Sequence, residues 1–227
     1  MGLEMVALLL DTNVFSHIIK TPWDELKSSM ESGVLREIRP EQDSQLKTSF
    51  AIDAEAELLD WMDTHGSLGG TPMSEALTTV SDGEEGLLLM MKWASPGAWE
   101  VWEGRAFLYL EVAMRTAVDS IHDLYTAPTW VAVSQALTGI AANEFSERVV
   151  LDWMERRKAL GETLDELEDP KIVPTFEAHD RASKTLVHAV NRVALDDSLV
   201  FIIGREHLEA TKWGHGDWNL SNYLQSS

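Results

Sequence analysis

Four carboxylates along the chain have the residue type and the setting that a divalent metal site requires. Asp11 follows the apolar run Val6–Leu10, and Glu57 stands near the start of a predicted helix. Asp197 begins another predicted helix, and Asp217 lies near the last loop. Mg²⁺ prefers oxygen ligands and is usually held by a few carboxylates together with waters. A cluster of these four acids would therefore form a candidate metal site.

The stretch that follows Val6 places Asp11 at the junction of a strand and a helix. After the polar triplet Asp11, Thr12 and Asn13, apolar residues recur at helical spacing, at Val14, Phe15, Ile18 and Ile19. In an open α/β sheet the carboxyl ends of the strands border the ligand crevice, so we expect Asp11 to face a site. Asp, Thr and Asn are also common N-cap residues. A purely structural capping role for Asp11 is therefore the alternative.

The first third of the chain alternates between predicted strands and helices. A second helix is expected over 21–38, with Thr21 as its N-cap and Pro22 at its first position. A short strand is expected at 49–52, and it leads into a helix that ends before Gly66. This alternation favours an α/β fold with a largely parallel sheet.

The pattern changes between about residue 66 and residue 170, where helical periodicity dominates and no strand is predicted. We interpret this stretch as a helical insertion, and its tryptophans as core packing. After it, a helix is expected over 176–193. A further helix is expected over 195–211, opened by Asp196 and Asp197, although the Val and Ile of "SLVFII" make a strand there the alternative.

Composition restricts the class of protein. The chain has 227 residues, no cysteine, and a formal net charge of −20, from 18 Lys plus Arg against 38 Asp plus Glu. The absence of cysteine, of a signal peptide and of a membrane span favours a soluble protein of the cytoplasm. So acidic a chain would repel phosphate backbones, which counts against a generic nucleic-acid binder. It counts less against a metal-dependent nuclease, whose carboxylate site becomes positive only when cations bind.

Taken in order, the segments "LLLDTNVF", "SFAIDAEAELL", "DDSLVF" and "GHGDWNL" resemble the PIN-domain nucleases, a family that includes many toxin-antitoxin ribonucleases. The resemblance implies a three-layer α/β/α domain with a short parallel sheet over 1–227, interrupted by the helical insertion at about 66–170. It also implies an endoribonuclease that cleaves single-stranded RNA with Mg²⁺ or Mn²⁺. An antitoxin-like protein partner and a homodimer are further expectations from the resemblance.

The resemblance assigns roles residue by residue. Asp11 matches the first acid of the family, and Asn13 matches a polar residue that follows it and could orient a water. The other acids match as follows: Glu57 is the second, with Glu55 as its alternative; Asp197 is the third, with Asp196 as its alternative; and Asp217 is the fourth. His215 stands where the family usually has a Thr before the fourth acid, and the helical insertion has no counterpart in shorter members.

Two other functions fit parts of the sequence. A catalytically inactive α/β module that binds a protein partner would suit the acidic charge and the nine tryptophans. "HGDWNLSN", residues 215–222, also fits the catalytic-loop spacing of aminoglycoside phosphotransferases, but no Gly-rich phosphate loop precedes it. The seven histidines show no paired zinc spacing, so no zinc site is predicted.

Overall fold

The computed structural model describes residues 5–44, 54–101, 105–118, 127–160 and 173–205. Contacts divide the chain into two compact units. The unit that we call the sheet unit comprises residues 6–100 and 197–227, and the helical unit comprises residues 101–196 together with residues 1–5. The chain thus leaves the sheet unit after Glu100 and returns to it at Asp197.

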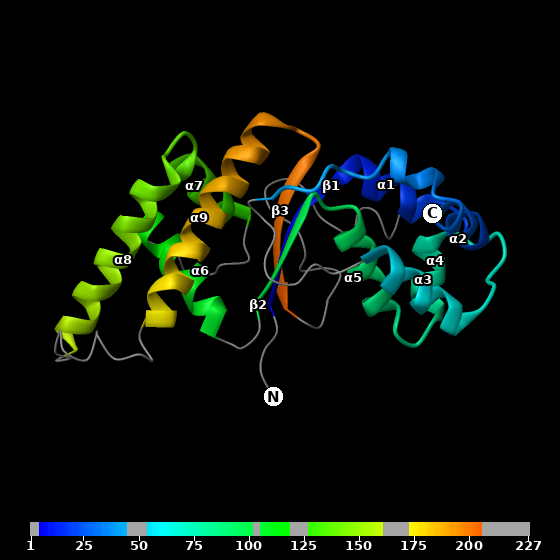
Figure 1. Cartoon of the computed structure of the whole chain (residues 1–227), viewed down its shortest axis with the longest axis horizontal. Helices are drawn as coiled ribbons and strands as arrows, with labels where there is room; N and C mark the ends of the chain where they lie inside the picture. The colour runs from blue at the N-terminus through cyan, green and yellow to red at the C-terminus, as the bar shows by residue number, and fades with distance from the viewer. Residues whose placement is uncertain (1–4, 45–53, 102–104, 119–126, 161–172, 206–227) are drawn as a thin grey trace. The chain divides into compact units, whose positions relative to one another are not determined.

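A short sheet with strand order β2-β1-β3 lies in the sheet unit (Figure 1). Its strands are β1 (Met5–Asp11), β2 (Gly97–Val101) and β3 (Leu199–Arg205). At the end of β1, the Asp11 N–H donates to the carbonyl of Ala94 and the Thr12 N–H donates to the carbonyl of Ser198. Both acceptors lie just before a neighbouring strand begins. Both neighbours therefore start where β1 ends, and both pairings are antiparallel.

The predicted three-layer α/β/α fold with a parallel sheet is wrong, because helices dominate the described residues and the sheet is antiparallel. Two strand assignments account for the error. β2 lies in the stretch for which no strand was predicted, and β3 occupies residues 199–205 of the helix predicted over 195–211, whose last residues lie outside the described part of the chain. In "SLVFII" the β-branched and aromatic residues outweigh the helix-start signal of the two preceding acids. The strand predicted at 49–52 lies outside the described residues.

Six helical segments accompany the strands in the part of the sheet unit that the structure describes. They are α1 (Thr12–Lys20), α2 (Trp23–Glu31), the 3₁₀ helix η1 (Val34–Glu37), α3 (Ala54–His65), α4 (Met73–Thr79) and α5 (Gly83–Trp93). The helix predicted over 21–38 is interrupted, since α2 ends at Glu31 and Gly33 takes a φ of 75° before η1 begins. Thr21 does not cap α2 with its side chain. Its hydroxyl instead donates to the carbonyl of His17 at the end of α1.

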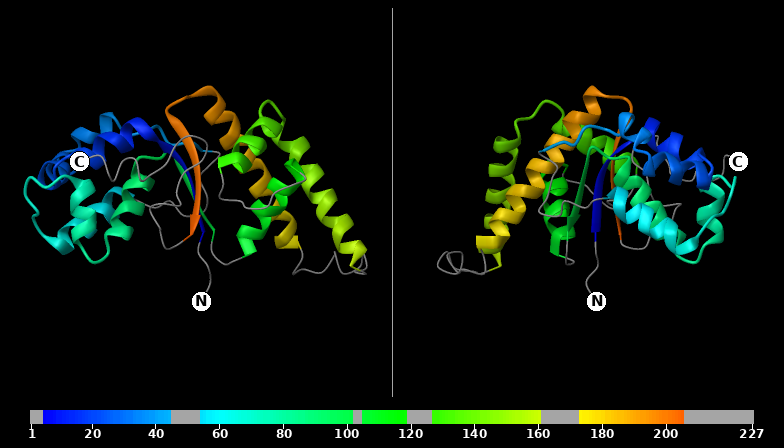
Figure 2. Two further views of the ribbon diagram at one scale, coloured as in Figure 1. Left: turned by 180° about the vertical axis from the view of Figure 1, so that it is seen from behind. Right: turned by 45° about the vertical axis from the view of Figure 1, so that its right-hand side comes forward.

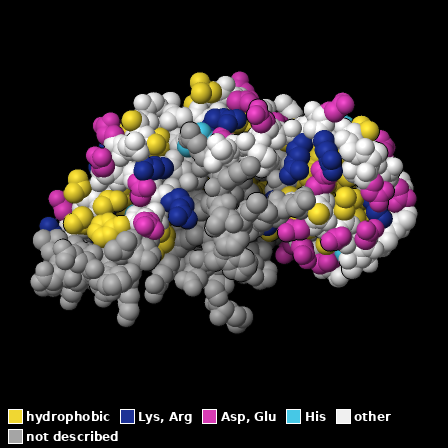
Figure 3. Space-filling view, in the orientation of Figure 1, with side chains coloured by type: hydrophobic (Ala, Val, Ile, Leu, Met, Phe, Trp, Pro, Cys, Tyr) yellow, Lys and Arg dark blue, Asp and Glu magenta, His cyan; other side chains and the backbone are white. Residues whose placement is uncertain are grey.

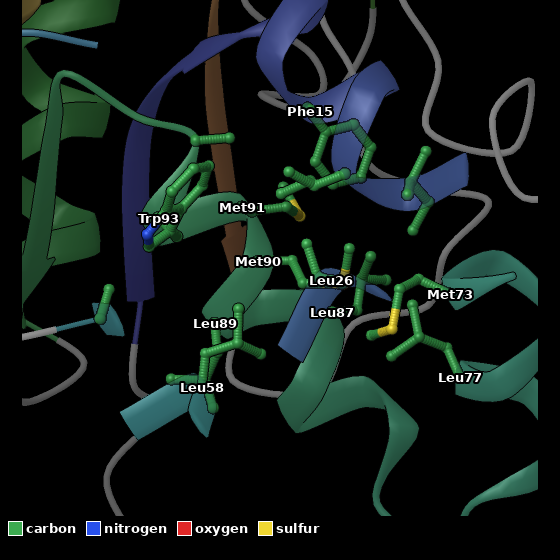
Figure 4. Packing of buried hydrophobic residues seen from close by; sticks show 14 of the residues in the cluster. Phe15, Leu26, Leu58, Met73, Leu77, Leu87, Leu89, Met90, Met91 and Trp93 are labelled. Atoms are coloured by element: carbon green, nitrogen blue, oxygen red, sulfur yellow. The ribbon is translucent and has the colours of Figure 1, made fainter. Parts of the chain in front are cut away.

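The core of the sheet unit forms where α1, α3, α4 and α5 pack on one another and on β1 (Figure 4). The aromatic side chains of Phe15 and Trp93 are fully buried in it. Helix α5 approaches its neighbours closely at two glycines, Gly83 and Gly86. A Cβ on Gly86 would lie 2.3 Å from the ring of Trp61, so only a hydrogen fits there. This packing fixes α5, and with it the Ala94 carbonyl that bonds to the end of β1.

The helical unit contains α6 (Arg105–Ala117), α7 (Ala127–Leu137), α8 (Ala142–Ala159) and α9 (Val173–Leu195), and Figure 2 shows α9 among the others. The prediction of a helix over 176–193 is confirmed by α9. Helix α9 packs on α6, α7 and α8 and is therefore central to this unit. Among the described residues, no helix is long and apolar enough to cross a membrane.

Candidate functional site

The candidate site is the edge of the sheet at which β1 ends. Thr12 makes two hydrogen bonds to the carbonyl of Ser198, from its backbone N–H at 2.8 Å and from its hydroxyl at 2.9 Å. These bonds join residues that are 186 positions apart in the sequence. Because Asp11 precedes Thr12 and Asp197 precedes Ser198, the structure brings the first and the third predicted acids to the same edge. Asp196, the alternative third acid, lies in the same turn, and both turn acids are exposed.

Asp11 also caps the helix that follows it. Its Oδ1 accepts hydrogen bonds from the backbone N–H of Asn13 at 2.9 Å and from that of Val14 at 3.0 Å. The alternative interpretation of Asp11 as an N-cap is therefore confirmed. Among the described residues, no hydrogen bond reaches its second oxygen, Oδ2. Because the cap uses only Oδ1, Oδ2 remains able to bind a ligand. Asn13 itself is exposed in the first turn of α1.

The two candidates for the second acid have different surroundings. Glu57 is exposed on α3. Glu55 is only 7% exposed, and its Oε1 accepts hydrogen bonds from Nε of Arg36 at 3.0 Å and from Nη2 of Arg36 at 2.8 Å. Its Oε2 accepts one from the indole Nε1 of Trp93 at 3.3 Å and lies 3.7 Å from Nη1 of Arg39. Glu55 is thus the centre of a buried ion-pair cluster.

The fourth predicted acid, Asp217, lies outside the described residues. Among the residues that the structure does describe, no group of three or more Asp, Glu, His or Cys side chains could hold a metal ion. The described part of the chain therefore brings Asp11 and the turn acids Asp197 and Asp196 to one edge, but neither candidate for the second acid joins them in a metal-binding group as the resemblance implies.

Two carboxylates are chemically sufficient for a weakly held hard cation, because Mg²⁺ often keeps several waters and takes further oxygens from a bound phosphate. Asp11 and Asp197 fit this requirement, since each carries a carboxylate at the same edge of the sheet and neither has a cationic side chain as its described partner. Glu55 does not fit, because two guanidinium groups already occupy its oxygens.

The charge around the site opposes the approach of an anion. In Figure 3 acidic side chains are spread over both units, and the lysines and arginines stand among them in small groups. With a net charge of −20, the chain as a whole repels nucleic acid. Any phosphate-containing substrate must therefore rely on local cations or on bound metal.

The two arginines around Glu55 were not among the residues predicted to form a site. Arg36 lies in η1 and Arg39 follows two residues after η1 ends, so the two arginines are three residues apart in one short segment. This spacing, together with a buried acid on the next helix, is the signal that could have identified the pair. Their surroundings nonetheless depend on tertiary contacts, because Trp93 and Glu55 belong to other helices.

Comparison with known proteins found no match for the chain among family models, curated proteins or solved structures.

Proposed function

We propose that this chain is a divalent-cation-dependent endoribonuclease whose cation site lies at the end of β1. The observation that supports the proposal is the pair of hydrogen bonds from Thr12 to Ser198, which brings Asp11 and Asp197 to one edge. Mg²⁺ or Mn²⁺ would be held by these two carboxylates, with single-stranded RNA as substrate. A cytoplasmic location, an antitoxin-like partner and a homodimer belong to the same proposal.

The chain's own residues have separate tasks in this proposal. Asp11 would hold the cation with the carboxylate oxygen that does not cap the helix, and because Oδ1 caps the first turn of α1, this side chain is already oriented. Asp197 supplies the second carboxylate from a turn whose position is fixed by Thr12. Asn13, exposed beside them, orients the attacking water. When bound, the cation lowers the pKa of a water and offsets charge on the scissile phosphate.

A titration with Mn²⁺ tests the proposal. The variant Asp11→Asn removes the charge of the carboxylate, and Asn remains a good N-cap residue, so α1 keeps its start. Asp60→Asn is the matched control, because Asp60 is an exposed acid of α3 to which the proposal assigns no role. The melting temperature and the cleavage of a labelled single-stranded RNA are measured together.

We expect Mn²⁺ to raise the melting temperature of the wild type and of Asp60→Asn, and both proteins to cleave the RNA. Asp11→Asn should show neither response while melting at the same temperature as the wild type without metal. Cleavage by Asp11→Asn at the wild-type rate, or a wild type that neither binds Mn²⁺ nor cleaves, would contradict the proposal.

A catalytically inactive module that binds a protein partner is the second candidate function. The observation that favours it is that the described contacts of Asp11 and Glu55 are structural, a helix cap and a buried ion-pair cluster. Under this alternative, Asp11→Asn keeps every binding property of the wild type. The same titration therefore separates the two functions.

A further inference from the structure

Thr12 donates two hydrogen bonds to one carbonyl oxygen. The backbone N–H of Thr12 donates to the carbonyl of Ser198 at 2.8 Å, and its hydroxyl donates to the same oxygen at 2.9 Å. A carbonyl oxygen has two lone pairs, so both bonds can form at once. Any residue except proline could make the backbone bond, whereas the second bond requires a hydroxyl. The side chain of Thr12 therefore adds a specific contact between the end of β1 and the turn that precedes β3.

The turn that carries Asp197 is exposed on one side of that residue and covered on the other. Residues 194–197 are all exposed, and Ser198 is half-buried. The next residue, Leu199, is only 3% exposed and begins β3. Ser198 is therefore the first residue after α9 at which the chain becomes covered again. Because Asp197 is bonded directly to Ser198, the position of its carboxylate depends on how firmly Ser198 is held.

We infer that Thr12 is a positioning residue of the cation site, because its hydroxyl holds Asp197 near Asp11 by fixing the Ser198 carbonyl. The inference rests on the proposed function and adds to it a residue that acts through another residue. The hydroxyl has one proton, and Thr12 donates that proton to Ser198. A ligand that is held in place before the cation arrives loses less conformational freedom on binding. The hydroxyl of Thr12 should therefore increase the affinity of the site for a cation.

The strength of one hydrogen bond limits the size of the effect. Removal of the hydroxyl can weaken cation binding by no more than this bond contributes to holding the turn. The net contribution of a typical hydrogen bond changes an equilibrium by about two- to tenfold. The backbone bond from Thr12 to Ser198 needs no hydroxyl, so its loss should loosen the turn and not release it. We therefore expect the affinity for Mn²⁺ to fall by about two- to tenfold while the fold is kept.

Binding of Mn²⁺ to the full chain, measured from the electron paramagnetic resonance signal of the free ion, tests the inference. Thr12→Val replaces the hydroxyl with a methyl group and should weaken Mn²⁺ binding by about two- to tenfold. Thr12→Ser keeps a hydroxyl and should bind Mn²⁺ like the wild type. Thr64→Val is the matched control, because the Thr64 hydroxyl donates to the carbonyl of Asp60 within α3, and it should leave the affinity unchanged. Urea unfolding without metal checks the fold of each variant.

Hydrogen–deuterium exchange without metal locates the effect in the chain. The amides of residues 198–201 should exchange faster in Thr12→Val than in the wild type, because the turn opens more easily, and Thr64→Val should show no such change. Equal Mn²⁺ affinities for the wild type and Thr12→Val, unchanged exchange at 198–201, or a Thr12→Ser variant as weak as Thr12→Val would overturn the inference alone. The proposed function fails separately when the expected differences in Mn²⁺ binding are found but the wild type does not cleave RNA. A wild type that binds no Mn²⁺ would overturn both.

Discussion

The buried histidine of the helical unit should make the protein less stable in mild acid. His179 on α9 is only 2% exposed, and its ring packs against Tyr109 at 4.7 Å and Trp153 at 5.2 Å between ring centroids. Among the described residues its Nδ1 has no hydrogen-bond partner. Burial in these surroundings disfavours the charged imidazolium and lowers the pKa of His179 to about 4 from an ordinary value of 6.5.

The direction and size of the effect follow from this difference. Between pH 6.5 and 4 the unfolded chain binds a proton at this histidine and the folded chain does not, so the free energy of unfolding decreases as the pH falls. The full difference between the two pKa values of His179 corresponds to roughly 3 kcal/mol in the free energy of unfolding. Between pH 7 and pH 5 we expect a loss of about 2 kcal/mol from His179.

Urea unfolding followed by circular dichroism at pH 7 and pH 5 checks this prediction. The variant His179→Phe keeps an aromatic ring between Tyr109 and Trp153 but cannot bind a proton, so it should lose about 2 kcal/mol less than the wild type over this pH range. His17→Gln, which removes an exposed histidine from α1, is the control and should follow the wild type. Equal losses for the wild type and His179→Phe would refute the reasoning.

Three further predictions concern packing and capping in the sheet unit. Gly86→Ala should destabilise the protein by about 1–3 kcal/mol in urea unfolding, because the added Cβ meets the ring of Trp61 at 2.3 Å, whereas Gly70→Ala meets nothing within 4 Å and should stay within about 0.5 kcal/mol of the wild type. Asp11→Ala should lower the free energy of unfolding by about 1 kcal/mol without metal, through loss of the cap, and an unchanged value would contradict the capping role. Phe15→Ala should cost about 3–5 kcal/mol because Phe15 is fully buried, and a loss below about 1 kcal/mol in the same assay would contradict its place in the core.

Local signals in the sequence predicted several elements correctly. The apolar run before Asp11 and the helical spacing after it correspond to β1 and α1, and the polar residue between them is the cap. The helix that ends before Gly66 corresponds to α3. These features depend on residues within one or two turns of each other, so periodicity and capping preferences are sufficient to predict them.

The errors concern features that depend on distant partners. Strand β2, Gly97–Val101, is five residues long, and its pairing with β1 across more than 85 positions is what makes it a strand. In "SLVFII" a strand and a helix were both compatible with the residues, and pairing with β1 decides for the strand. The residues of a strand do not indicate which distant strand it will pair with, which is why strand formation depends more on context than helix formation does.

For the candidate site, local sequence patterns were enough to place Asp11 between a strand and a helix and to place two acids before "SLVFII". Which acids share a location depends on how the strands pair. Because β3 runs antiparallel to β1, its amino end lies beside the carboxyl end of β1, and Asp197 lies near Asp11; in a parallel pairing the start of β3 would lie at the opposite edge. Tertiary packing also places Glu55 against Arg36 and Arg39. Strand direction and helix packing both depend on contacts between residues far apart in the chain.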